Sequence, residues 1–169
     1  ITDVNQLAGL PESAIQAAQE LAKSKDLEGY LFTLDIPSYL PVMSYADNRE
    51  LREEMYQAFV MRASDQGPTA GKWDNSAIID ETLALRHELA QLLGFDSYAH
   101  DSLATKMAET PDQVLGFLND LAEKSRPQAQ AEIAELREFA AEQSGDTDLQ
   151  AWDLSYYGEK LKQHKYAIS

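Results

Sequence analysis

The chain has 169 residues, 44% of them hydrophobic and 25% charged, which is typical of a soluble globular protein with one buried core. Its 29 acidic and 14 basic residues give a net charge of −15, which disfavours nucleic acid and membrane surfaces as partners. The absence of cysteine excludes disulfides and thiolate chemistry and favours a cytoplasmic location. No signal peptide or membrane-spanning run is evident, and both ends look cut, so we expect a piece of a longer protein.

The first predicted element is a helix over residues 9–25. Pro11 suits its first turn, and lysines at its far end match the helix dipole. Residues 30–34 form an aromatic and apolar run bounded by Gly29 and Pro37, which favours a short strand. Nothing else in the chain resembles a strand, so a partner strand is expected outside the sequence given.

Two further helices are predicted before residue 64. A short one follows Ser38, and the next begins at Asp47, whose spacing from Glu50 is that of a capping box. Apolar residues then recur at helical spacing as far as Arg62, whereas a loop rich in Gly and Pro follows over residues 65–76.

The second half of the chain has the clearest helix boundaries. A helix is predicted over residues 75–93, ending at Gly94 as a left-handed cap, and a short helix over residues 96–108. The long stretch 109–145 should be helical with a kink or break at Pro127.

Both later helices also carry N-terminal signals. Thr110 and Gln113 have capping-box spacing around Pro111, and the last helix, within residues 151–166, is predicted to be capped by Asp153. We find no repeat and no convincing domain boundary, so the sequence predicts an all-α, multi-helix array with at most one short strand. Several aromatic residues have the spacing of helical core positions: Tyr56, Phe59, Phe117 and Phe139.

One segment resembles a zinc-binding motif. His87 and Glu88 begin a His-Glu-x-x-His pattern, but Gln91 replaces the second histidine, and glutamine is a weak zinc ligand. A helical wheel places His87 outside the apolar arc and Glu88 on the polar side, so both should face water. The other histidines, His100 and His164, are not at ligand spacing with His87.

The sequence therefore predicts no catalytic, cofactor-binding or metal-binding residue within the chain. A phosphate-binding loop and a nucleophile elbow are also missing, and the paired acidic residues lie on polar helix faces. Two arginines, Arg62 and Arg86, fall on apolar stripes. The aliphatic part of each side chain could pack on the apolar face while the guanidinium group reaches water. We expect instead that each guanidinium is shielded from water and paired with a carboxylate, because an unpaired buried charge is costly.

Three long stretches, in this order, point to a family: "LDIPSYLPVMSYADNRELREEMYQAFVMRASD", "DNSAIIDETLALRHELAQLLGFDSYAHDSLATKMAETPDQVLGFLNDLA" and "AWDLSYYGEKLKQHKYAIS". Together they resemble the oligopeptidase A branch of the thimet-oligopeptidase family of zinc metallopeptidases over nearly the whole chain. The "LLGF-x-x-Y", "KMA" and "WD-x-x-YY" elements make the resemblance specific. It implies a mostly helical enzyme that cleaves short peptides in a deep channel.

The resemblance also places the family's zinc helix, with its true His-Glu-x-x-His, after residue 169. Zinc is therefore implied for the parent enzyme and not for this chain, and residues 1–169 are expected to be one inactive segment of wall and scaffold. As a fragment, it is expected to expose apolar surface where the rest of the enzyme packs. Its expected partners are the remainder of its own polypeptide, short peptide substrates and a second copy of itself. The competing hypothesis is a helical binding or adaptor module without catalysis.

Overall fold

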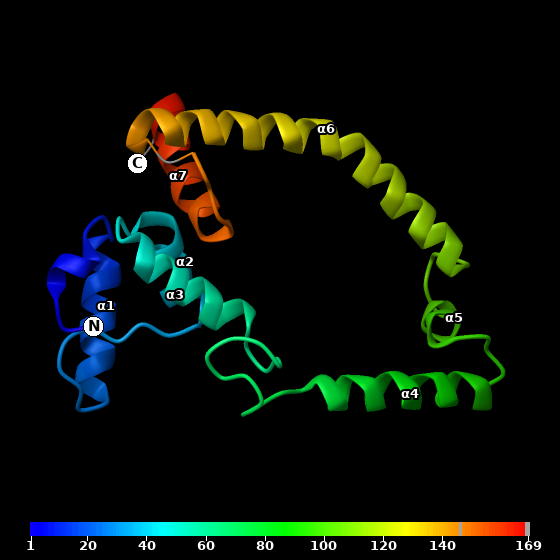
Figure 1. Ribbon diagram of the computed structural model, residues 1–169. Coiled ribbons are helices and arrows are strands. Elements are labelled where there is room, and N and C mark those ends of the chain that lie inside the picture. The colour runs from blue at the N-terminus through cyan, green and yellow to red at the C-terminus, as the bar shows by residue number, and fades with distance from the viewer. Residues whose placement is uncertain (146, 168–169) are drawn as a thin grey trace. The chain divides into compact units, whose positions relative to one another are not determined.

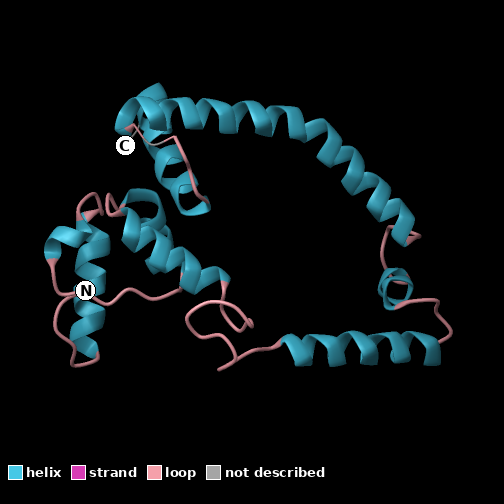
Figure 2. Cartoon of the chain, viewed as in Figure 1, coloured by secondary structure: helices cyan, strands magenta, loops and turns pink. Residues whose placement is uncertain are grey.

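The computed structural model describes residues 1–145 and 147–167, and these residues form helices and loops without any β-strand (Figures 1 and 2). The all-α prediction is confirmed. The helices are α1 (Glu12–Ser24), α2 (Ile36–Tyr45), α3 (Arg49–Val60), α4 (Ser76–Leu92), α5 (Tyr98–Leu103), α6 (Pro111–Ser144) and α7 (Leu154–Tyr166), with 3₁₀ turns η1 (Val4–Leu7) and η2 (Ala151–Asp153).

The chain divides into two compact units, which are described separately. The first unit contains residues 1–62 together with the described residues from 133 onward, and the second contains residues 63–132. Helix α6 belongs to both, because the division falls within it.

The core of the first unit forms where α2 packs against α3 and α7. Helix α3 begins at Asn48, whose side chain accepts a hydrogen bond from the backbone N–H of Leu51 at 3.2 Å. The sequence prediction of Asp47 as the cap was therefore wrong by one residue, since Asp47 has other partners. The buried apolar side chains of this core are Leu7, Leu10, Tyr39, Val42, Met43, Ala46, Leu51 and Met55.

Residues 30–34 are a loop, so the predicted strand is not present. The backbone of Tyr30 exchanges two hydrogen bonds with that of Ile1, at 2.8 and 2.9 Å, and Leu31 N–H donates to Ala18 O at 3.0 Å. Tyr30, Phe32 and Leu34 pack against the core of the first unit. The aromatic and apolar run thus reflects packing, but Ile1 and α1 provide the hydrogen-bond partners that a neighbouring strand would have supplied.

A second small cluster joins the end of α6 to α7. Ser144 and Tyr157 share a hydrogen bond between their hydroxyl oxygens at 2.7 Å. The buried members of the cluster are Leu136, Phe139, Ala140, Tyr156 and Tyr157. Phe139 therefore has the core position expected from its spacing.

In the second unit, the helix boundaries follow the sequence signals closely. Helix α4 ends beside Gly94, which has a φ of +81°, and α6 begins at Pro111. Thr110 Oγ1 accepts from Gln113 N–H at 3.2 Å, while the Gln113 side chain accepts from Glu109 N–H at 2.8 Å. Helix α6 continues through Pro127 without a break.

Packing within the second unit is sparse. Of the residues of α4, only Ala90 is buried, and large apolar side chains of α4 and α6 are open to solvent. Phe117 is 62% exposed, so the prediction that it is a core residue was wrong for this chain. The expectation that the chain exposes extensive apolar surface is confirmed. None of the described helices is long and apolar enough to cross a membrane.

Candidate functional site

Asp153 is a fully buried carboxylate that joins the two chain segments of the first unit. Arg52 Nη2 donates to its Oδ1 at 2.8 Å. Arg49 Nη2 donates to Oδ2 at 2.6 Å, and Arg49 Nε lies 3.1 Å from both oxygens. The backbone N–H of Gln150 also donates to Oδ2, at 3.0 Å. Both oxygens of the carboxylate are therefore fully used by donors of this chain.

Arg52 is only 2% exposed, and its remaining donors are also satisfied. Its Nη1 donates to Ala46 O at 2.7 Å, and its Nε donates to Trp152 O at 3.3 Å. The guanidinium carbon lies 3.9 Å from the centroid of the Tyr156 ring. Because a buried charge is stable only when it is paired and hydrogen-bonded, these contacts explain how an arginine can lie inside the core.

The local sequence explains the arrangement. Arg49 and Arg52 are three residues apart in the first turns of α3, so their side chains lie on one face of the helix. Asp153 ends η2 and directly precedes α7. It holds the N-cap position of α7, as predicted, but its side chain makes no capping hydrogen bond to that helix and is used by the two arginines.

A second polar group borders the first. Tyr156 OH donates to Asp47 Oδ1 at 2.6 Å, and Lys160 Nζ lies 3.4 Å from the same oxygen. Burial and the Asp47 hydrogen bond raise the pKa of Tyr156, and Lys160 opposes this only in part. Burial would lower the pKa of Lys160, but its interactions with Tyr156 and Asp47 leave that pKa raised.

The electrostatic balance at Asp153 keeps it ionised. Burial by itself would raise the pKa of this carboxyl group, but the hydrogen bonds from Arg49, Arg52 and Gln150 outweigh burial and hold the pKa below its ordinary value. A general base needs a pKa near the working pH and access to a substrate proton. Asp153 has neither, and two adjacent arginines repel any cation. The cluster therefore fastens α3 to η2 and α7 and is structural.

The segment that resembles a zinc motif lies on α4 of the second unit, where His87 and Glu88 are both exposed, as predicted. Gln91, at the position of the missing histidine, has a different role: its Nε2 donates to Phe95 O and Asp96 O, each at 3.1 Å. It satisfies carbonyl groups in the turn that follows the helix. The glutamine is thus part of the helix terminus and does not point with His87 toward a common ligand.

The other histidines have separate local contacts. His100 Nδ1 lies 2.9 Å from Ser97 Oγ at the start of α5, and the His164 ring lies 5.5 Å from the Phe139 ring. Among the residues that the structure describes, no group of three His, Asp or Glu side chains could hold a metal ion. The described residues therefore do not bring together the three protein ligands that a catalytic zinc ion requires.

The structure corrects the prediction for the two arginines on apolar stripes. Arg62 and Arg86 are both exposed, and neither has an ion pair with a described carboxylate. Each lies over an aromatic ring instead: Arg62 is 4.5 Å from the centroid of Phe59 and Arg86 is 4.9 Å from that of Tyr98. An exposed guanidinium keeps its water and packs its flat face on the ring, so no carboxylate is required.

The sequence analysis did not identify Arg52 as a buried arginine, although Arg52 has the same kind of helical spacing from apolar residues as Arg62. Arg52 precedes Met55 by three residues and Phe59 by seven, which places it on the same apolar stripe as Arg62. Position along the helix separates the two, because Arg52 lies in the first turns of α3 beside η2, whereas Arg62 lies beyond the last turn. That difference is a tertiary contact and could not be inferred from spacing.

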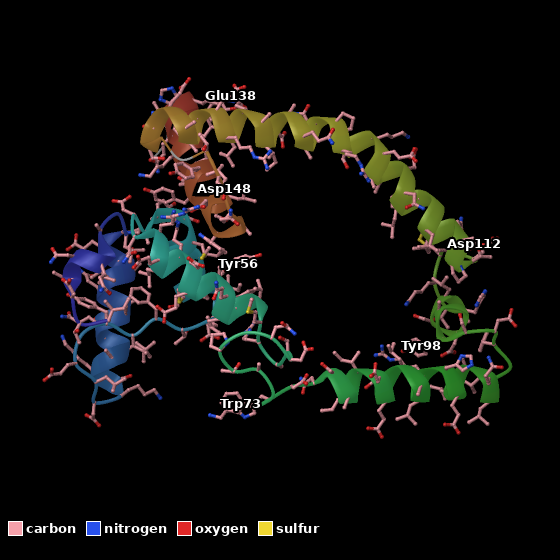
Figure 3. The ribbon with its side chains drawn as sticks, in the orientation of Figure 1. Tyr56, Trp73, Tyr98, Asp112, Glu138 and Asp148 are labelled. Atoms are coloured by element: carbon pink, nitrogen blue, oxygen red, sulfur yellow. The ribbon has the colours of Figure 1, made fainter. Side chains whose placement is uncertain are left out.

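Two of the larger surface hollows formed by the described residues lie apart from Asp153 and its arginines. One of about 310 Å³, in the first unit, is lined by α6 and α7 residues including Glu138, which Figure 3 labels, together with Glu142 and His164. The other, of about 330 Å³ in the second unit, is apolar and is lined by residues including Leu103 and Val114. Neither contains a nucleophile paired with a base, so neither has the parts of a catalytic site.

Comparison with known proteins gives a family and close relatives. Residues 42–169 match the model of Peptidase family M3. The whole chain is 66% identical to oligopeptidase A of Salmonella typhimurium and 65% identical to oligopeptidase A of Escherichia coli. It is 43% identical, again over its full length, to the probable cytosolic oligopeptidase A of Arabidopsis thaliana. The chain spans only about a quarter of the length of these relatives.

The match to the family model covers well over half of the chain, and the identity to the bacterial oligopeptidases extends from the first residue to the last. The resemblance that the sequence motifs carry is thereby confirmed. This chain belongs to peptidase family M3.

Proposed function

We propose that the chain is a non-catalytic part of a longer zinc metalloendopeptidase of the oligopeptidase A type. The observation that carries the proposal is the 66% identity to an oligopeptidase A over the whole chain, of which the chain spans 25%. Residues 1–169 form a single segment that precedes the zinc-binding helix, and the zinc ligands and general base lie outside them. The location of the parent enzyme is the cytoplasm.

The proposed substrates are short peptides, such as signal-peptide remnants and other intermediates of protein degradation. The role of this segment is to form wall and scaffold of the channel in which those peptides are cleaved. The Asp153 cluster (Asp153 with Arg49 and Arg52) supports this role, because the hydrogen bonds of the buried carboxylate link α3 to η2. The charge of −15 disfavours nucleic acid and anionic membranes as additional partners.

The alternative is a helical binding or adaptor module, and the exposed apolar surface of α4 and α6 is the observation in its favour. Reading the coding sequence beyond Ser169 separates the two proposals. A parent peptidase requires a His-Glu-x-x-His segment and a further glutamate downstream, whereas an adaptor requires neither.

The activity itself is tested on the full-length protein with its bound metal. Replacing the glutamate of that downstream motif by glutamine should abolish cleavage of an oligopeptide while the bound zinc remains, since the glutamate acts on water and is not a ligand. A full-length protein that has an intact motif and bound zinc but cleaves no oligopeptide would favour the adaptor.

A further inference from the structure

Helix α4 has an apolar half that the rest of the second unit leaves largely exposed, although α5 packs against part of it around Arg86. At 100° per residue, its large aliphatic side chains occupy one half of the helix circumference. All of them are exposed: Ile78, Ile79, Leu83, Leu85, Leu89 and Leu92, by 44–78%. A helix with so wide an apolar face normally lies against another layer of the protein.

Arg86 lies near the middle of this apolar half. Its guanidinium rests over the ring of Tyr98, which Figure 3 labels at the start of α5. No carboxylate of the described residues is within ion-pair distance of it. While α4 is exposed, water solvates this charge, so the absence of a partner costs little.

When another surface covers α4, the charge of Arg86 loses this solvation. A surface that packs on the aliphatic side chains also removes water from Arg86, and a buried guanidinium without a counter-charge is strongly unfavourable. The covering surface therefore has to be apolar for most of its area and has to supply one acidic group. The first unit contains a buried pair of this kind, since Arg52 is buried together with the carboxylate of Asp153.

We propose that a helical surface of the parent polypeptide, outside these 169 residues, covers α4 and presents a carboxylate to Arg86. The inference rests on the proposed function in taking the chain as part of a longer peptidase. The relatives are about four times its length, so the covering mass is available. A second copy fits less well, because two chains with a charge of −15 repel each other.

The test compares Arg86→Met with Arg62→Met in the full-length protein. Methionine keeps an apolar stem of similar length and removes only the charge. Both arginines lie on an aromatic ring, but α3, which ends just before Arg62, already buries Leu51 and Met55 within the chain. Arg86→Met should lower the thermal midpoint by several degrees, because it leaves the opposing carboxylate buried and unpaired, whereas Arg62→Met should change it little.

Arg86→Lys provides the measurement if Arg86→Met does not fold. Lysine keeps the charge, so this variant should fold with a midpoint between those of Arg86→Met and the unaltered protein. Equal midpoints for Arg86→Met and Arg62→Met, or equal loss with Lys and Met at position 86, would overturn the inference. So would conversion of a dimer to a monomer by Arg86→Met, because the cover would then be a second copy.

Failure of this inference is distinguishable from failure of the proposed function. If the full-length protein cleaves peptides but substitutions of Arg86 do not change its stability, the inference is contradicted and the proposed function is still supported. A charge-dependent loss of stability in a protein that cleaves no peptide would support the inference and remove the proposed activity.

Discussion

Asp153 shows at the scale of single residues why two charges can be stable inside a small core. The attraction between Asp153 and Arg52 offsets the loss of hydration only because every remaining donor and acceptor has a partner. Removal of one member should therefore cost far more than the loss of one hydrogen bond, since the other charge stays buried.

Asp153→Asn should lower the free energy of unfolding by about 3–5 kcal/mol, because it leaves Arg52 buried without its counter-charge. Urea unfolding followed by circular dichroism measures the change. Asp120→Asn is the matched control, since it removes the same charge from an exposed pair with Lys124 and should have a minimal effect. Equal losses in both variants would contradict a structural role for the buried pair.

The pH dependence of this contribution follows from the lowered pKa of Asp153. The unfolded chain binds the proton more readily than the folded one, so the contribution is complete above the ordinary carboxyl pKa of about 4 and is lost as the pH falls through the lower, folded pKa. The difference in stability between the unaltered protein and Asp153→Asn should be constant between about pH 5 and 8. A difference that already narrows in that interval would show that Asp153 does not have a lowered pKa.

At the scale of helices, the same substitution should have opposite effects at two glycines of the second unit. Gly94→Ala should destabilise by about 1–2 kcal/mol, because Gly94 has a φ of +81° and an L-residue is strained there. Gly116→Ala, inside α6 with open space around it, should stabilise by about 0.5–1 kcal/mol. Urea unfolding of the two variants gives the signs, and a loss at Gly116 would mean that α6 packs differently.

Helix termini could be predicted from the sequence because their signals are local. Gly94, Thr110 and Pro111 mark boundaries through their own backbone preferences, and the structure has helix ends at each of them. Asn48 was missed in favour of its neighbour Asp47 because both residue types cap helices equally well. The contacts of Asp47 with Tyr156 and Lys160 distinguish it from Asn48, and the first of these joins residues 109 positions apart.

Two other positions show the influence of their surroundings. Residues 30–34 have an apolar and aromatic pattern that suits a strand, but Ile1 and α1 occupy the position where a neighbouring strand would pair, so the predicted strand does not form. Pro127 removes one helical hydrogen bond and was expected to kink or break the helix; of these two outcomes the break is absent, because the turns on both sides are long enough for α6 to continue.

At the scale of the whole molecule, the two units differ in what they bury. The first has a core of apolar side chains with a paired charge cluster, and the second leaves most of its large apolar side chains in water. The sequence indicated that apolar surface would be exposed. Helical periodicity could not indicate which helices would expose their apolar faces to solvent, because buried and exposed apolar faces have the same spacing of residues.

The isolated chain, without its parent polypeptide, should therefore self-associate at an ionic strength that screens its charge of −15. Sedimentation equilibrium should give an apparent mass that rises with concentration, since burial of the aliphatic face of α4 is favourable in any complex that covers it. Leu85→Gln combined with Leu92→Gln should reduce the association, and His87→Gln, on the polar side of the same helix, should not. A monomer at every concentration would contradict this expectation.

The central claim, that these residues are a scaffold for a catalytic centre located elsewhere in the polypeptide, is tested most directly by cleavage of a quenched fluorescent oligopeptide. The full-length protein should cleave it, and a metal chelator should abolish the activity. Residues 1–169 alone should not cleave it with or without added zinc, because catalytic zinc requires about three convergent protein ligands. Chelator-sensitive cleavage by residues 1–169 that Arg86→Met leaves intact and His87→Ala abolishes would contradict the claim.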